Sequence, residues 1–518
     1  MRQTDRFHLA FGQPLHVLAF VVGLFFTSPA LAQSLPLNHW TVLIHGRTST
    51  LGGFSYDNLT NPADPGGWMG KVAQAISDLD PGAVNIYKMN DDTFDLVVVQ
   101  GTSPSDTTKH HVLHFDWTAT SDIFVPGGGS SPNGDDGYSY AAGDALYALL
   151  ARYGATDRVQ ALIGYSRGVP VASETTRRLI LRGAAPKQVI NLDGEGEGGT
   201  IFIRPDYIDQ VFDAWSAGTN PIDWRNIRAN PALGNVGGAP NLPGASNLDL
   251  TATHNHGGDV NDNPPPVWKY LIDPGNLTVQ REMFVIAGAW TTPNIAAQPS
   301  PTDPAFFPAP AHPTPPILFN GDFQWGSGSS NTAAAGWSAH GAGGNGLIFN
   351  SSGDYALGLG AAFSSSTSRT HSWLALPPGQ NDLSLTLDIF DASPGEALVA
   401  RFETFDGFIF DLDPIILSTI GTQLVELNVP TDVSGAVVRL QLLLVTGGGA
   451  PTASVIIDDI NITNTPGPLG DLNGDGLVDG ADLATLLSQW NTDGSADLND
   501  DGAVNGADLA ALLANWTG

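Results

Sequence analysis

Residues Val159 to Gly168 read V-Q-A-L-I-G-Y-S-R-G, and this stretch decides the fold of the first half of the chain. A short apolar run, typical of a strand, leads into Gly164-x-Ser166-x-Gly168, and the helix-like sequence V-P-V-A-S-E-T-T-R-R-L follows. The two glycines permit a turn too tight for a side chain, so that Ser166 Oγ is held above the edge of a sheet. This setting predicts a nucleophile at Ser166, and a plain Gly/Ser turn is the alternative.

The residues around this turn alternate between strand-like and helix-like runs. Strand-like sequence occupies residues 40–46, 111–117 and 188–193, and helix-like sequence occupies 69–79, 140–153 and 169–181. Strands that alternate with helices predict a mostly parallel sheet with helices on both faces.

A serine nucleophile requires a base and a carboxylate that orients the base. Asp193 ends the apolar run V-I-N-L-D, which places it at the carboxyl edge of a parallel sheet, where ligands bind. We therefore prefer Asp193 as the acid, with Glu195, Glu197 and Asp223 as alternatives.

The base is expected in the run T-H-N-H-G-G-D, which holds the only histidines between Asp193 and residue 290. His256 is preferred because two glycines follow it, and His254 is the alternative. A different interpretation of the same run is a metal site formed by His254, His256 and Asp259.

The motifs H-G-R at residues 45–47, G-Y-S-R-G, N-L-D and H-N-H resemble those of secreted bacterial lipases and esterases, in the same chain order. The resemblance covers about half of the chain and implies an α/β-hydrolase fold that cleaves carboxylic esters. It also implies an oxyanion hole formed by the backbone N–H groups of Arg47 and Arg167.

Composition limits the remaining possibilities. The 518 residues are too many for one core, and a net charge of −31 argues against nucleic-acid binding. The chain begins with two positive charges, Arg2 and Arg6, followed by an apolar run at 15–26 and small residues at 30–32. Residues 1–32 are therefore predicted to be a secretory signal peptide. We expect a secreted protein with no transmembrane segment.

Two breaks divide the mature chain into three modules. Nine of the 26 residues in 291–316 are proline, which predicts a semi-rigid linker, and T-P-G-P-L-G at 465–470 is a shorter break. The expected modules are 33–290, 317–464 and 471–518.

The middle module, 317–464, consists of short alternating strands and predicts a β-sandwich of the jelly-roll type. Its N-G-D-F-Q and I-D-D-I-N-I runs resemble carbohydrate-binding domains, which implies a carbohydrate partner. Trp325, Trp337 and Trp373 are candidates for stacking on sugar rings, and core or edge packing is the alternative.

The last module contains a tandem repeat with an offset of 26 residues, starting at Asp471 and Asp497. Each copy opens with D-x-N-x-D-G and carries Asp at position twelve, which is EF-hand-like calcium spacing. The expected ligands of two structural calcium ions are Asp471, Asn473, Asp475, Leu477 (carbonyl), Asp479 and Asp482, then Asp497, Asn499, Asp501, Ala503 (carbonyl), Asn505 and Asp508.

The loop–helix duplication resembles a type I dockerin, which implies a cohesin-type protein partner. Positions ten and eleven of each repeat are Gly-Ala, where hydroxyl residues are common in cellulosomal dockerins. Calcium binding is therefore the stronger expectation of the two.

Together these patterns predict a secreted serine hydrolase of carboxylic esters with no cofactor for catalysis. An amide hydrolase on the same fold and a non-catalytic adhesion or scaffold protein are the alternatives.

Overall fold

The computed structural model describes residues 35–46, 67–89, 94–117, 138–181, 184–194, 222–229, 246–256, 263–272, 317–323, 334, 336–339, 347–349, 355–363, 367–446, 452–465, 467–473, 476–492, 494, 496–499 and 502–517. Several predicted features lie outside these residues: the signal peptide, the proline-rich segment 291–316, Arg47, Glu195, Glu197, Asp259, Trp325, Asp475 and Asp501.

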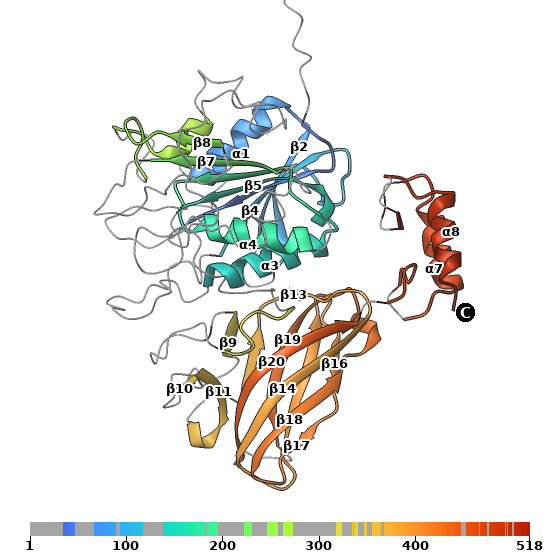
Figure 1. The fold of residues 1–518 in the computed structure, drawn as a ribbon. Helices are drawn as coiled ribbons and strands as arrows, with labels where there is room; N and C mark the ends of the chain where they lie inside the picture. Colours follow the sequence, from blue (N-terminus) through green and yellow to red (C-terminus); the bar gives the residue numbers. More distant parts are fainter. Residues whose placement is uncertain are drawn as a thin grey trace, which may run out of the picture.

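The described residues form three modules of different architecture (Figure 1). A mostly parallel α/β sheet comes first, an antiparallel β-sandwich follows, and two short helices end the chain. The predicted fold class of each module is thereby confirmed.

The α/β module is built on one eight-stranded sheet in the order β3-β2-β4-β1-β5-β6-β7-β8. Only the β2–β3 pair is antiparallel, and the other neighbours run parallel. Its elements are β1 (Trp40–Ile44), α1 (Trp68–Leu79), β2 (Val84–Met89), β3 (Leu96–Gln100), β4 (His110–Phe115), α3 (Tyr138–Arg152), η1 (Thr156–Arg158), β5 (Val159–Tyr165), α4 (Gly168–Leu181), β6 (Gln188–Leu192), β7 (Asp223–Arg228), β8 (Ser246–Asp249) and η2 (Val267–Leu271).

Apolar side chains on alternate strand positions divide the core of this module into two layers. Leu43 and Ile163 pack with α1 and η2 on one face, while Val42 and Leu162 pack with α3 and α4 on the other. Every residue of β1, β5 and β6 is buried, as expected for central strands covered on both faces.

The antiparallel edge strand β3 was not among our sequence expectations. Its three valines, Val97, Val98 and Val99, are exposed by 50%, 45% and 36%. The strand therefore contributes hydrogen bonds to the sheet and little to its core.

The second module packs two antiparallel sheets face to face, with strand orders β10-β11-β20-β14-β18 and β16-β15-β19-β12-β9. The long strands alternate buried and half-buried residues, and their inward leucines and isoleucines form one core. Its elements are β9 (Trp337–Ala339), β10 (Leu347–Phe349), β11 (Tyr355–Gly360), η4 (Ala361–Phe363), β12 (Ser368–His371), β13 (Leu374–Ala375), β14 (Gln380–Asp391), β15 (Ala397–Thr404), β16 (Ile409–Asp411), β17 (Ile415–Ile416), β18 (Gly421–Asn428), η5 (Thr431–Val433), β19 (Val437–Val445) and β20 (Ser454–Thr465).

The third module consists of the two repeats, whose helices are α7 (Gly480–Ser488) and α8 (Gly506–Ala514). Each helix begins with a capping box. Asp479 or Asn505 caps the helix, and the aspartate three residues later accepts a hydrogen bond from the backbone N–H of that cap residue. Two leucines of each helix form a small shared core with the loop valines: Leu483 and Leu486, then Leu509 and Leu512.

The repeats also make reciprocal backbone contacts with one another. Val478 of the first loop accepts a hydrogen bond from Thr517 N at 2.9 Å, and Val504 of the second loop accepts one from Asn491 N at 2.9 Å. Val478 N in turn donates to Thr517 Oγ1 at 2.7 Å. Each loop is thus closed by the segment that follows the helix of the other repeat.

Candidate active site

The carboxyl edge of the parallel sheet gathers the three residues expected to form a triad. Ser166 follows β5, Asp193 follows β6, and His256 lies in the stretch that follows β8. Because β5 to β8 run parallel, the loops that leave their carboxyl ends meet at one edge.

Ser166 stands on a strained turn between β5 and α4. Its φ is +54°, in the left-handed region that non-glycine residues rarely adopt, and its N–H donates to Leu192 O at 3.0 Å. A Cβ at Gly164 would lie 2.5 Å from Gly168 O, and one at Gly168 would clash with the Ile44 carbonyl. The two glycines therefore permit the close approach of strand, turn and helix that presents the serine.

A chain of hydrogen bonds joins the three side chains. His256 Nε2 lies 3.0 Å from Ser166 Oγ, and His256 Nδ1 lies 2.6 Å from Asp193 Oδ2. The Asp193 carboxylate accepts, so Nδ1 carries the proton and Nε2 is left to accept from the serine hydroxyl. The exposed fractions of Ser166, Asp193 and His256 are 4%, 0% and 6%.

The acid and the base are each fixed by further contacts. Asp193 Oδ1 accepts a hydrogen bond from Ala229 N at 2.9 Å, which leaves Oδ2 for the histidine. Tyr165 donates its hydroxyl to the backbone carbonyl of His256, and its ring stacks on the imidazole with centroids 5.4 Å apart. No sequence expectation covered Tyr165, although its place beside Ser166 in the turn was a usable signal.

The alternative residues lie elsewhere. His254 Nδ1 is 3.0 Å from Thr253 Oγ1, and its ring packs edge-on against Tyr270. Asp223 begins β7, at the amino edge of the sheet, and pairs with Arg225. Among the residues that the structure describes, no group of three or more His, Cys, Asp or Glu side chains is placed to hold a metal ion.

The turn after β1 lies against the serine. A Cβ at Gly46 would come within 2.7 Å of Ser166 Cβ, so glycine is required at this contact. His45 holds the turn: its Nε2 accepts from Trp117 N at 3.1 Å, and its backbone carbonyl accepts from Trp117 Nε1 at 2.8 Å. Arg167 is buried, and its guanidinium lies 5.9 Å from the centroid of the Trp117 ring.

In the two expected calcium loops, backbone N–H groups donate hydrogen bonds to the aspartate carboxylates. Asp471 Oδ2 accepts from Gly476 N at 2.8 Å, and the equivalent Asp497 Oδ2 accepts from Gly502 N at 2.7 Å. Asp482 is fully buried and accepts from the backbone of Leu472 at 2.8 Å. Carboxylate, amide and carbonyl oxygens are the donors that calcium prefers, so the described members of each set have the donor chemistry for this ion, although their side chains are not gathered into a metal-holding group.

Two of the three tryptophans proposed to stack on sugars are engaged in packing. Trp337 is 5% exposed within the sandwich core, and its Nε1 donates to Asn320 O at 3.0 Å. Trp373 stacks on Phe94 of the α/β module with centroids 5.9 Å apart. Both residues therefore fit the alternative interpretation given above, in which these tryptophans pack in the core or at its edge.

Comparisons with known proteins identify the last module. Residues 469–515 match the type I dockerin domain, and domains of this type bind calcium. A search of curated proteins found no significant match. Among the helices that the structure describes, none is long and apolar enough to cross a membrane.

Solved structures of other proteins are similar to part of the chain. The module TmCBM61 in complex with β-1,4-galactotriose is 14% identical, with a TM-score of 0.21, and covers 29% of this chain and 99% of its own. The second module of carbohydrate-binding family 16 is 13% identical, with a TM-score of 0.21 and the same coverage of 29% and 99%. The K1 cleaved adhesin domain of Lys-gingipain from Porphyromonas gingivalis W83 is 11% identical, with a TM-score of 0.21, and covers 28% and 96%.

Proposed function

We propose that the α/β module is a serine hydrolase of carboxylic esters, with Ser166 as nucleophile, His256 as base and Asp193 as the orienting acid. The hydrogen-bonded chain from Asp193 through His256 to Ser166, on a turn of positive φ, is the observation that carries the proposal. The order of the three residues along the chain and their position at one sheet edge support it.

The chemistry follows from the tautomer of His256. Its Nε2 takes the proton of the Ser166 hydroxyl as the serine oxygen bonds to the ester carbonyl carbon. Collapse of the tetrahedral adduct breaks the ester bond, and His256 gives its proton to the departing alcohol. Water then attacks the acyl-serine with His256 again as base, which releases the acid and restores Ser166.

The developing oxyanion needs hydrogen-bond donors beside the serine. The backbone N–H groups of Arg167 and Arg47 are proposed for this role, because Arg167 follows the nucleophile and Arg47 follows the Gly46 contact. Each such donor contributes about 3 kcal/mol to lowering the barrier.

Hydrolysis of nitrophenyl esters of increasing chain length by the full chain tests this proposal. Ser166→Ala should lower kcat by about 10⁴-fold or more, and His256→Ala should have a comparable effect. His254→Ala is the matched control, which should retain the parent activity. Parent activity in a folded Ser166→Ala variant would overturn the proposal.

The same assay separates the alternative functions. Nitroanilides cleaved faster than esters would identify an amide hydrolase, since the triad supports both reactions. A folded chain that cleaves neither substrate would favour a non-catalytic adhesion or scaffold protein.

We also propose that the dockerin domain binds two calcium ions through the residues named above, including Asp475 and Asp501, and that a cohesin-type module is its partner. The signal-like residues 1–32 support export, which matches an extracellular partner. Titration with a panel of cohesin modules in calcium tests the partner.

A further inference from the structure

The α/β module and the sandwich share a continuous apolar boundary. Trp373, Phe405 and Val437 of the sandwich pack against the buried cluster beneath α3 and α4 of the α/β module. The contact is made by α3 with β13 and β19, where the two modules meet in Figure 1.

One end of this boundary is a row of aromatic rings and arginines drawn from both modules. Phe94 stacks on Trp373 at 5.9 Å with an interplanar angle of 19°, and Trp373 contacts Phe405 at 5.1 Å. Arg152 of α3 lies over the Phe405 ring, and Arg439 of β19 lies 5.1 Å from the Trp373 ring. Cation–π and stacked contacts of this kind are favourable when they exclude water.

The arginine that crosses the boundary is held in position. Arg152 donates to Phe94 O at 2.6 Å and to the Asp95 carboxylate at 2.8 Å. These two hydrogen bonds fix the Arg152 side chain. It therefore loses little conformational entropy when it packs on the Phe405 ring of the sandwich.

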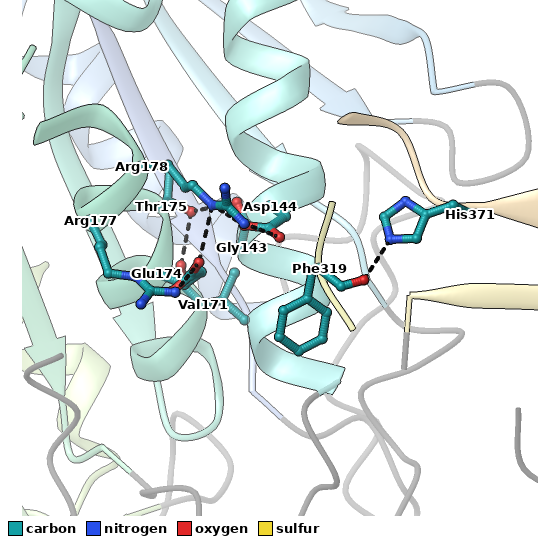
Figure 2. Close-up of polar contacts among 9 residues, drawn as sticks. All are labelled: Gly143, Asp144, Val171, Glu174, Thr175, Arg177, Arg178, Phe319 and His371. Atoms are coloured by element: carbon teal, nitrogen blue, oxygen red, sulfur yellow. Dashed lines mark hydrogen bonds and ion pairs between the residues drawn. The ribbon is translucent and has the colours of Figure 1, made fainter. Parts of the chain in front are cut away.

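The other end of the boundary is formed by residues 317–323 and β12. Phe319 contacts Tyr140 of α3 with centroids 6.3 Å apart, and His371 Nε2 hydrogen-bonds to Phe319 O at 3.0 Å. A Cβ at Gly336 would lie 3.6 Å from Ala141 Cβ, so the backbone of the sandwich reaches α3 directly. Figure 2 shows the hydrogen bond that joins Phe319 and His371.

We propose that the α/β module and the sandwich form one folding unit, in which the sandwich is a permanent structural partner of α3. The sequence predicted folded units separated by a proline-rich spacer, but this boundary holds them by side-chain contacts of its own. The proposal does not depend on the catalytic role of Ser166.

Cleavage of the folded chain tests the proposal without requiring either piece to fold alone. A protease recognition sequence inserted within 291–316 would be cut after folding, and the products would be separated by size-exclusion chromatography. The two pieces should elute together at the mass of the uncut chain. Elution as two separate species would overturn the proposal.

Variants locate the contact. Trp373→Ala combined with Arg152→Ala should release the cut pieces from one another, because both changes remove rings and charge from the boundary. Leu424→Ala is the matched control, since Leu424 is 68% exposed on β18 of the other sheet, and its cut pieces should still elute together. Pieces that stay together in the double variant would overturn the assignment to this boundary.

Thermal unfolding of the uncut chain gives a second, independent readout. The α/β module and the sandwich should unfold in one calorimetric transition, separate from that of the dockerin domain. Two resolved transitions for the α/β module and the sandwich would contradict the proposal. The double variant should split the single transition into two.

Discussion

At the scale of single residues, the candidate site concentrates backbone strain. Ser166 and Asp193 have φ values of +54° and +45°, and both follow central strands of the sheet. Non-glycine residues in this region cost about 1–3 kcal/mol each, so the surrounding packing must hold them there. In this backbone conformation the Ser166 and Asp193 side chains both lie within hydrogen-bonding distance of His256.

Tyr165 gives a prediction at this scale. Tyr165→Phe keeps the ring against the His256 imidazole and removes only the hydroxyl that binds its backbone carbonyl. We expect kcat for a nitrophenyl ester to fall by about 5-fold, since a neutral hydrogen bond contributes about 1 kcal/mol, while KM stays unchanged.

Tyr87→Phe is the control for that experiment, because the Tyr87 hydroxyl is also hydrogen-bonded, to Thr102 O at 3.1 Å and to His111, away from the triad. It should lower the free energy of unfolding and leave kcat unchanged. Equal kcat values in the parent and in Tyr165→Phe would show that the hydroxyl does not position the base.

At the scale of elements, a buried charge network joins α3 to α4, the helix that follows the nucleophile (Figure 2). Asp144 makes two hydrogen bonds to Arg178, at 2.5 and 2.6 Å, and Arg177 pairs with Glu174 at 2.8 Å. Gly143 permits the close approach, because a Cβ there would lie 2.5 Å from Glu174 Cβ. The network fixes the relative position of the two helices.

Removal of one partner should therefore be costly. Asp144→Ala leaves Arg178 charged and buried with one carboxylate fewer, so we expect the free energy of unfolding to fall by about 3–5 kcal/mol in a urea titration. Asp411→Ala breaks an ion pair with Arg401 in which the Asp411 side chain is 56% exposed, and it should cost less than about 1 kcal/mol. Equal losses in the two variants would contradict the structural role of the network.

Element positions were largely predictable from sequence, and contacts between elements were not. The runs at 40–46 and 188–193 and the helices at 69–79 and 140–153 correspond to β1, β6, α1 and α3, because their apolar periodicity matches their burial. Strands β2, β3, β7 and β8 were not predicted, and β3 is an apolar run whose valines are exposed at the edge of the sheet.

The candidate site was predictable to the level of residue type and chain order. The choice between His254 and His256 depended on tertiary contacts: only His256 lies within hydrogen-bonding distance of both Asp193 and Ser166. The tryptophan that the sequence offered as a sugar contact, Trp373, is used in a boundary that no local pattern encodes.

At the scale of the whole molecule, buried histidines set the response to acid. Burial lowers the pKa of four histidines to about 4 from an ordinary 6.5: His110, His111, His114 and His371. Between these two pH values the unfolded chain binds protons that the folded chain does not. The free energy of unfolding should therefore fall as the pH falls from about 6.5 to about 4.

Asp144 acts in the opposite direction, because burial raises its pKa to about 7 from 3.8 and the folded chain binds that proton more tightly. Four histidines against one carboxyl still predict lower stability at pH 5 than at pH 7.5, as measured by urea titration. His110→Asn should make the pH dependence shallower. Greater stability of the parent chain at pH 5 would contradict this assignment.

Calcium removal should act on the dockerin domain alone. Residues 471–518 contain nine aspartates and no lysine or arginine, so without a cation their carboxylates repel one another. We expect EGTA to abolish the calorimetric transition of α7 and α8 and to leave nitrophenyl ester hydrolysis unchanged.

A separate calorimetric titration counts the calcium ions that bind. The parent chain should bind two calcium ions, and Asp471→Ala or Asp497→Ala should each reduce the number to one. Asp432→Ala, in η5 of the sandwich, is the control and should leave the number at two.

Because the repeats exchange contacts, a residue that follows α8 stabilises the loop of the first repeat and not its own. Thr517 bonds through its backbone and side chain to Val478, which lies in the loop of the first repeat. Loss of the Thr517 contacts would therefore loosen the loop at 471–482 and spare the loop at 497–508, which is nearer in sequence.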